Sequence, residues 1–88
     1  MKIKDGFVMR EVAGQIVVIA VGEASKDFHG MIYLNSTGKC IWEGVRDGLS
    51  EKAIVGKLIQ AYDVDSKKAR QDVHAMILKM VEAGVIEQ

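Results

Sequence analysis

Only three side chains in this 88-residue sequence suggest covalent or metal chemistry. Cys40, His29 and His74 are of the types that supply a nucleophile with a base, or ligands for a metal ion. They are isolated in the sequence, with no second cysteine and no CxxC or HxxxH spacing. The sequence therefore predicts no catalytic site, no metal site and no cofactor, and structural or surface roles for these three residues.

The stretch STGKC at 36–40 has some likeness to a phosphate-binding loop. Such a loop needs more than one glycine before the lysine, and a serine or threonine after it to hold Mg²⁺. Here Gly38 is the one glycine, and Cys40 follows the lysine. We therefore expect no phosphate binding, and we interpret Gly38 as a position where a helix approaches a sheet closely.

Charge and hydropathy limit the partners and the compartment. Lysine plus arginine and aspartate plus glutamate each number 12, so the net charge favours neither nucleic acid nor an anionic membrane. The first residues, MKIKDG, contain no apolar signal segment, and the apolar run Ile16–Val21 is too short to span a bilayer. With a single cysteine, these features predict a soluble cytoplasmic protein.

The elements that would position a site follow from hydrophobic period and turn residues. Strands are predicted at 7–12 and 15–21, on either side of an Ala13-Gly14 turn, and at 31–34 after a polar connection. Helices are predicted at about 36–47, 51–62 and 66–83. The expected caps are Asn35 or Ser36, then Ser50, then Asp65 or Ser66. This order predicts one α+β domain over residues 1–88, a three-stranded antiparallel sheet followed by a three-helix bundle.

The predicted third strand, MIYL at 31–34, lacks the usual protection of an edge strand. It contains no lysine, no proline and no inward-pointing charge. An unprotected edge indicates that another segment adds to it, and an extended peptide can do so through backbone hydrogen bonds. The N-terminal residues of the chain, or a second copy of it, are alternative occupants.

Several short motifs together resemble one family. They are LN-x-TG-x-x-IW at 34–42, DG-x-S at 47–50, YDVD at 62–65, DV at 72–73 and AGVI at 83–86. From about Phe7 to Ile86 the sequence resembles the PqqD-like family, named for protein D of coenzyme PQQ (pyrroloquinoline quinone) synthesis. Its members include the RiPP recognition element, where RiPPs are peptides made on the ribosome and then modified.

The resemblance implies a winged helix-turn-helix-like domain that binds peptides and catalyses nothing. In this family the leader segment of a precursor peptide adds to the third strand and lies against the third helix. The domain presents it to a modifying enzyme, either a radical S-adenosylmethionine protein or a leader peptidase. Carried over by position, the peptide-binding residues are Met31, Ile32, Tyr33 and Leu34 on the strand and Arg70, His74, Ile77 and Val81 on the helix.

Two other functions remain open at this stage. The predicted second and third helices form a helix-turn-helix pattern, and SKKAR at 66–70 would open a recognition helix, so a winged-helix DNA-binding regulator is one alternative. The other is a dimerisation module in which two copies pair through the same edge strand. DNA binding would require a basic stripe on the third helix and would depend strongly on salt.

Overall fold

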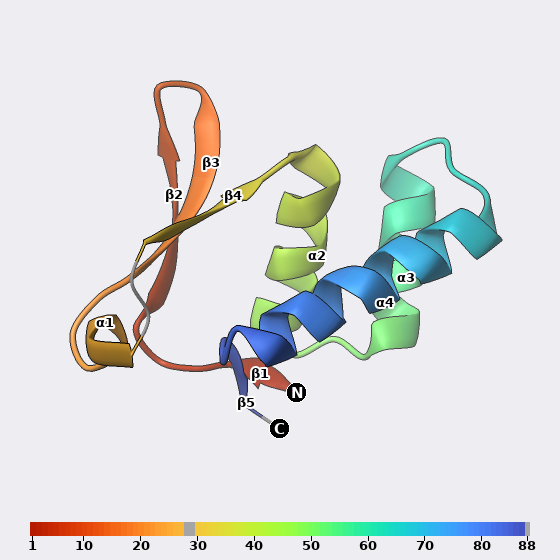
Figure 1. Cartoon of the computed structure of the whole chain (residues 1–88). Coiled ribbons are helices and arrows are strands. Elements are labelled where there is room, and N and C mark those ends of the chain that lie inside the picture. The colour runs from red at the N-terminus through yellow and green to blue at the C-terminus, as the bar shows by residue number, and fades with distance from the viewer. Residues whose placement is uncertain (28–29, 88) are drawn as a thin grey trace.

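Three strands form an antiparallel sheet in the order β2-β3-β4, and Figure 1 shows it beside the three long helices. The strands are β2 (Phe7–Val12), β3 (Gln15–Ala20) and β4 (Met31–Leu34). The computed structural model describes residues 1–27 and 30–87, so the candidate His29 lies outside the described residues. The predicted bounds of the first and third of these strands are confirmed, and the second ends one residue earlier than expected.

The β2–β3 hairpin turns at Ala13 and Gly14, as predicted. Both residues have positive φ, 52° and 81°, which is the combination that a two-residue type I′ turn requires. Strand pairing then runs without a skipped residue from Val12 opposite Gln15 to Phe7 opposite Ala20. Because the register is continuous, side chains alternate strictly between the two faces of the sheet.

Three helices follow the sheet, and side-chain caps fix where each begins. They are α2 (Ser36–Arg46), α3 (Glu51–Ala61) and α4 (Ser66–Glu82). Asn35 Oδ1 accepts from the Gly38 N–H at 2.8 Å, Ser50 Oγ from Ala53 at 3.1 Å, and Asp65 Oδ1 from Lys68 at 2.8 Å. The caps are therefore Asn35 and Asp65 where the sequence left two choices. Each helix ends one residue before its predicted end.

The core lies between the helices and one face of the sheet. Its most completely buried large side chains are Trp42, Ile54, Leu58, Val18, Val45, Val73 and Val85. Gly44 lets α2 and α3 pack closely, because a Cβ at this position would lie 2.7 Å from Ile54 Cγ1. Cys40 belongs to this core, with 8% of its surface exposed, and packs there as a small apolar side chain.

A second, two-stranded sheet joins the two ends of the chain, and the sequence patterns did not indicate it. Strand β1 (Lys2–Ile3) pairs antiparallel with β5 (Ile86–Glu87), and the Lys4 N–H donates to the Val85 carbonyl at 2.8 Å. The N-terminal residues therefore lie against β5 and do not cover β4, which rules out one of the occupants considered above. The polar connection after β3 also contains a short helix, α1 (Ala24–Asp27).

Candidate functional site

The outer side of β4 is an open edge. Within the described residues β4 is the last strand of its sheet and pairs with β3 on its other side. Antiparallel pairs alternate between those that exchange hydrogen bonds and those that do not. The Val21 N–H donates to the Gly6 carbonyl at 2.7 Å, so position 21 bonds toward β2. Counting back along the continuous register, Ile19 and Val17 also bond toward β2, while Val18 and Ile16 bond toward β4.

This alternation decides which backbone groups of β4 face outward. Val18 lies opposite Ile32, and Ile16 lies opposite Leu34, so these two β4 residues use their N–H and C=O groups on β3. The N–H and C=O groups of Met31 and Tyr33 then point away from the sheet. In residues 1–27 and 30–87 no other strand lies on that side. Two positions of β4, separated by Ile32, therefore offer unpaired donors and acceptors to an incoming strand.

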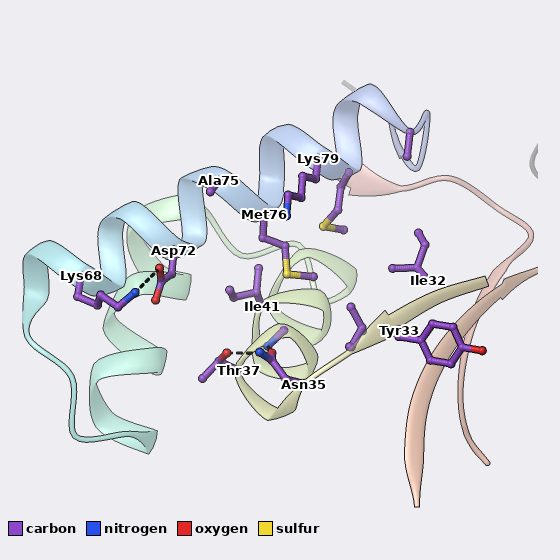
Figure 2. Close-up of a pocket in the computed structure, with 14 residues that line it drawn as sticks. Ile32, Tyr33, Asn35, Thr37, Ile41, Lys68, Asp72, Ala75, Met76 and Lys79 are labelled. Carbon is purple, nitrogen blue, oxygen red and sulfur yellow. Dashed lines mark hydrogen bonds and ion pairs between the residues drawn. The ribbon is translucent and has the colours of Figure 1, made fainter. Parts of the chain in front are cut away.

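A groove of about 600 Å³ runs beside this edge, between β4 and α4 (Figure 2). Strand β4 and the cap of α2 form one wall, and the first turns of α2 form the floor. The lining residues on this side are Ile32, Tyr33, Leu34, Asn35, Thr37, Gly38 and Ile41. Helix α4 forms the opposite wall with Lys68, Asp72, Ala75, Met76, Lys79, Met80 and Ala83. The middle of the groove is therefore apolar, and charged groups lie on the helical wall.

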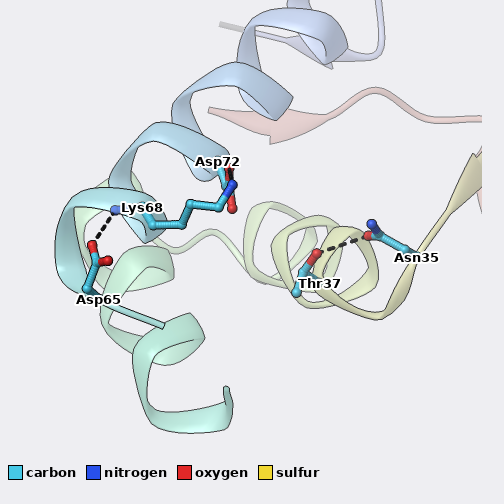
Figure 3. Close-up of polar contacts among 5 residues, drawn as sticks. All are labelled: Asn35, Thr37, Asp65, Lys68 and Asp72. Carbon is cyan, nitrogen blue, oxygen red and sulfur yellow. Dashed lines mark hydrogen bonds and ion pairs between the residues drawn. The ribbon is translucent and has the colours of Figure 1, made fainter. Parts of the chain in front are cut away.

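The polar groups at one end of the groove already have partners within the chain (Figure 3). Lys68 Nζ lies 3.1 Å from Asp72 Oδ1, one helical turn further along α4. Asn35 Oδ1 accepts from the Thr37 hydroxyl at 3.0 Å as well as from the Gly38 N–H. This end of the groove is therefore close to neutral and internally satisfied.

Gly38 lies at the start of α2, beside the end of β4. A Cβ at this position would lie 3.5 Å from the Leu34 Cβ and 3.1 Å from Asn35 Oδ1. The contact with Leu34 would be an ordinary van der Waals distance, so the tighter of the two is with the cap residue. Ile41, one turn later on α2, lies in the floor of the groove. A second hollow, between the hairpin tip and the start of α2, shares Tyr33, Leu34 and Asn35 with the groove. The end of β4 is therefore accessible from two sides.

Comparison with protein-family models matches residues 8–86 to the family described as Coenzyme PQQ synthesis protein D (PqqD). The chain belongs to the PqqD family. A comparison with curated proteins gives no match. The resemblance recognised from the motifs at 34–42, 47–50, 62–65 and 83–86 is thereby confirmed.

Two solved structures share the fold of this PqqD-family chain. One is TbiB1 in complex with the TbiA(beta) leader peptide, 21% identical, with a TM-score of 0.79 over 99% of this chain and 95% of that one. The other is lasso peptide synthetase B1 complexed with the leader peptide, 18% identical, with a TM-score of 0.78 over 99% and 96%. The predicted α+β class, a three-stranded antiparallel sheet followed by helices, is confirmed.

The four strand residues expected from the PqqD family lie at the edge and the groove. Ile32, Tyr33 and Leu34 line the groove. Met31 begins the strand and is 55% exposed, and Tyr33 is 64% exposed. Since exposure alternates along β4, Met31 and Tyr33 lie on the outer face, and Ile32 and Leu34 on the face that packs toward the helices.

The four helix residues expected from the PqqD family do not line this groove. His74 Nδ1 lies 3.3 Å from Glu51 Oε1, so its side chain is directed toward α3. Ile77 is buried in the core at 8% exposure, and Val81 packs against the core. Arg70 is exposed, outside the set that lines the groove. Whether these four contact a peptide stays a prediction; the groove face of α4 carries Asp72, Ala75, Met76 and Lys79 instead, which sequence reasoning missed.

Two further observations concern metal binding and membrane insertion. Within the part of the chain that the structure describes, no three histidine, cysteine, aspartate or glutamate residues are grouped so as to hold a metal ion. Over the same residues, no helix has the length and hydropathy needed to span a bilayer.

Proposed function

We propose that this protein binds the leader segment of a ribosomally made precursor peptide as an added strand on β4. The observation that carries the proposal is the pair of outward-facing backbone positions, Met31 and Tyr33, directly beside the groove along α4. Strand addition needs both features, an open edge for the backbone and pockets for alternate side chains. Membership of the PqqD family supports it, as do two similar structures that are complexes with leader peptides.

The geometry of strand addition divides the peptide's side chains into two sets. Residues of the peptide that exchange hydrogen bonds with Met31 and Tyr33 would place their side chains on the outer face, beside the Tyr33 ring. Residues between them would face inward, next to Ile32 and Leu34, and enter the groove toward Met76. We therefore propose peptide contacts along β4 and along the groove face of α4, in place of Arg70, His74, Ile77 and Val81.

The length of β4 limits how many residues of the peptide can pair with it. Four residues of β4 span about 13 Å, so about four to six peptide residues would pair or lie in the groove. We expect micromolar affinity or tighter, about −8 kcal/mol. The protein itself would act as a non-catalytic peptide chaperone in the cytoplasm, handing the bound precursor to a radical S-adenosylmethionine enzyme or a leader peptidase.

Self-pairing of two copies through β4 is the second candidate function, because the same open edge would support it. The two functions differ in concentration dependence, and a peptide that binds β4 would compete with a homodimer. DNA binding has no comparable support, since the chain carries no net charge.

The test is an NMR titration of ¹⁵N-labelled protein with synthetic peptides that tile the N-terminal half of the precursor encoded beside its gene. The expected result is saturable shifts of the amides of 31–34 together with those of α4 near Met76. A scrambled peptide of the same composition is the control. Shifts confined to α3 and the turn before it would contradict the placement, and shifts that appear on dilution alone would favour the homodimer.

A further inference from the structure

The groove contains one positive charge that has no ion-pair partner among the residues that the structure describes. Of its three charged lining residues, Lys68 and Asp72 form an ion pair with each other at 3.1 Å. Lys79 forms no ion pair with any residue that the structure describes. It is in the last turn of α4, where the helix dipole favours a cation. The groove lining therefore has a net charge of +1, located at Lys79.

Lys79 is exposed in the free protein, and its neighbours on the helical wall of the groove are apolar. Lys79 lies beside Met76 on the side of α4 that faces β4 (Figure 2), with Met80 and Ala83 further along the same wall. Met80 is only 3% exposed. A peptide filling the groove would displace water from the Lys79 ammonium, and burial of an unpaired charge is costly. A carboxylate on the peptide would restore a charge-assisted hydrogen bond.

The spacing of the helix relates that carboxylate to its apolar neighbour. Met76 and Lys79 are three residues apart on α4, about 4.5 Å along the helix axis. Side chains on one face of a strand recur every two residues, about 6.7 Å apart. The length of the lysine side chain covers the difference, so adjacent inward-facing peptide residues can meet Met76 and Lys79. This holds for either direction of the added strand.

We propose that the groove selects a peptide strand in which an aspartate or glutamate lies two positions from a large apolar residue. The apolar side chain packs against Met76 and Ile41, and the carboxylate pairs with Lys79. This inference rests on the proposed function, and it names the chemical class of the peptide at that site. Lys79 acts as a specificity residue.

The experiment is selection from a displayed library of random ten-residue peptides against three forms of the protein. They are the parent, Lys79→Glu, and Lys67→Glu as a control. Lys67 is exposed on α4 and lies outside the groove, so this control makes the same change in net charge. The parent and Lys67→Glu should enrich the pattern of an acidic and an apolar residue two positions apart, whereas Lys79→Glu should enrich lysine or arginine at the acidic position.

The affinity of one selected peptide for each variant measures how much the pairing of its acidic residue with Lys79 contributes to binding. Replacing its acidic residue by lysine should weaken binding to the parent by about 10-fold, equivalent to 1.4 kcal/mol, and the same peptide should recover affinity on Lys79→Glu. Lys79→Ala should lose the acidic preference without gaining a basic one. Circular dichroism of each variant checks that the fold is retained.

Two results would overturn the inference, and they are distinguishable from each other. Selected peptides that shift the amides of 31–34 but show no acidic preference, or a preference that Lys67→Glu changes as much as Lys79→Glu, would remove the role of Lys79 and leave peptide binding at β4 intact. Selected peptides that leave the amides of 31–34 unmoved would overturn the proposed function, and the role of Lys79 with it.

Discussion

The three-stranded sheet has two edges, β2 and β4, and they differ in how they are protected. Strand β2 carries Arg10 and Glu11, both exposed, whereas β4 carries no charged residue. By the alternation derived above, the backbone groups of Glu11 point away from β3, as those of Tyr33 do on the other edge. One sheet therefore combines an edge with charges that discourage strand pairing and an edge without them.

The surroundings of the two edges differ in the same sense. Both hollows described above are lined by residues of β4, and neither is lined by residues of β2. The N-terminal residues reach β5 and leave β4 uncovered. Absence of charge at β4 thus coincides with space for an occupant. This coincidence separates an edge adapted to binding from one that is merely unprotected.

The largest expected effect comes from breaking the inner side of β4. Ile32→Pro removes an N–H that bonds to β3, leaves an acceptor on buried Val18 unsatisfied, and loses packing of a half-buried side chain. We expect a loss of roughly 2–4 kcal/mol in the free energy of unfolding. Urea denaturation followed by tryptophan fluorescence measures it, since Trp42 is buried in the core. A variant as stable as the parent would contradict the assigned bonding pattern.

The second effect is on peptide binding, and proline at the two edges tests the comparison directly. Tyr33→Pro removes an outward N–H on β4, while Glu11→Pro removes an outward N–H on β2. Because proline is tolerated where the N–H faces away from the ladder, both should cost little stability. We expect Tyr33→Pro to weaken binding of the precursor leader peptide about 10-fold, or 1.4 kcal/mol, and Glu11→Pro to leave it unchanged.

Isothermal titration calorimetry with the leader peptide measures both affinities. Tyr33→Thr is a further control, because it removes the exposed ring and keeps the N–H. If Tyr33→Thr weakens binding as much as Tyr33→Pro, the ring and not the backbone holds the peptide. Equal losses for Tyr33→Pro and Glu11→Pro would remove the distinction between the two edges.

Local signals in the sequence were sufficient for most elements and for the open edge. The Ala13-Gly14 turn, the caps at Asn35, Ser50 and Asp65, and the absence of charge in 31–34 depend on residues close together in the chain, and the structure has them as predicted. The β1–β5 pairing could not be predicted in this way. Each of its strands has two residues, and they come from opposite ends of the chain.

The face of α4 that lines the groove was also beyond the sequence pattern. Helix α4 buries Ala69, Val73, Ile77 and Met80, and apolar residues flank this stripe on both sides. Val81 lies on one flank and Met76 on the other, so hydrophobic period alone does not say which flank faces β4. That depends on how α4 crosses α2, which is a property of packing between helices. The expected contacts at 70, 74, 77 and 81 therefore lie off the flank that lines the groove, and whether they contact a peptide stays a prediction.

The smallest expected effect comes from removing the protection of β2. Arg10→Thr combined with Glu11→Val gives that edge the uncharged, β-branched character of β4 and replaces no buried residue, so the free energy of unfolding should change by less than about 0.5 kcal/mol. The double variant should nevertheless self-associate through β2, because its unpaired backbone groups would no longer be flanked by charges. We expect a weak dimer with a Kd of about 1 mM, equivalent to −4.1 kcal/mol. Sedimentation velocity over a concentration series detects it, and amide shifts confined to β2 distinguish it from pairing at β4.

The matched variant Lys52→Thr with Glu51→Val changes the same charges on α3, away from both edges, and should remain as monomeric as the parent. If the β2 double variant also stays monomeric, charge is not what keeps that edge unpaired, and the lack of charge in β4 loses its value as a sign of a binding edge.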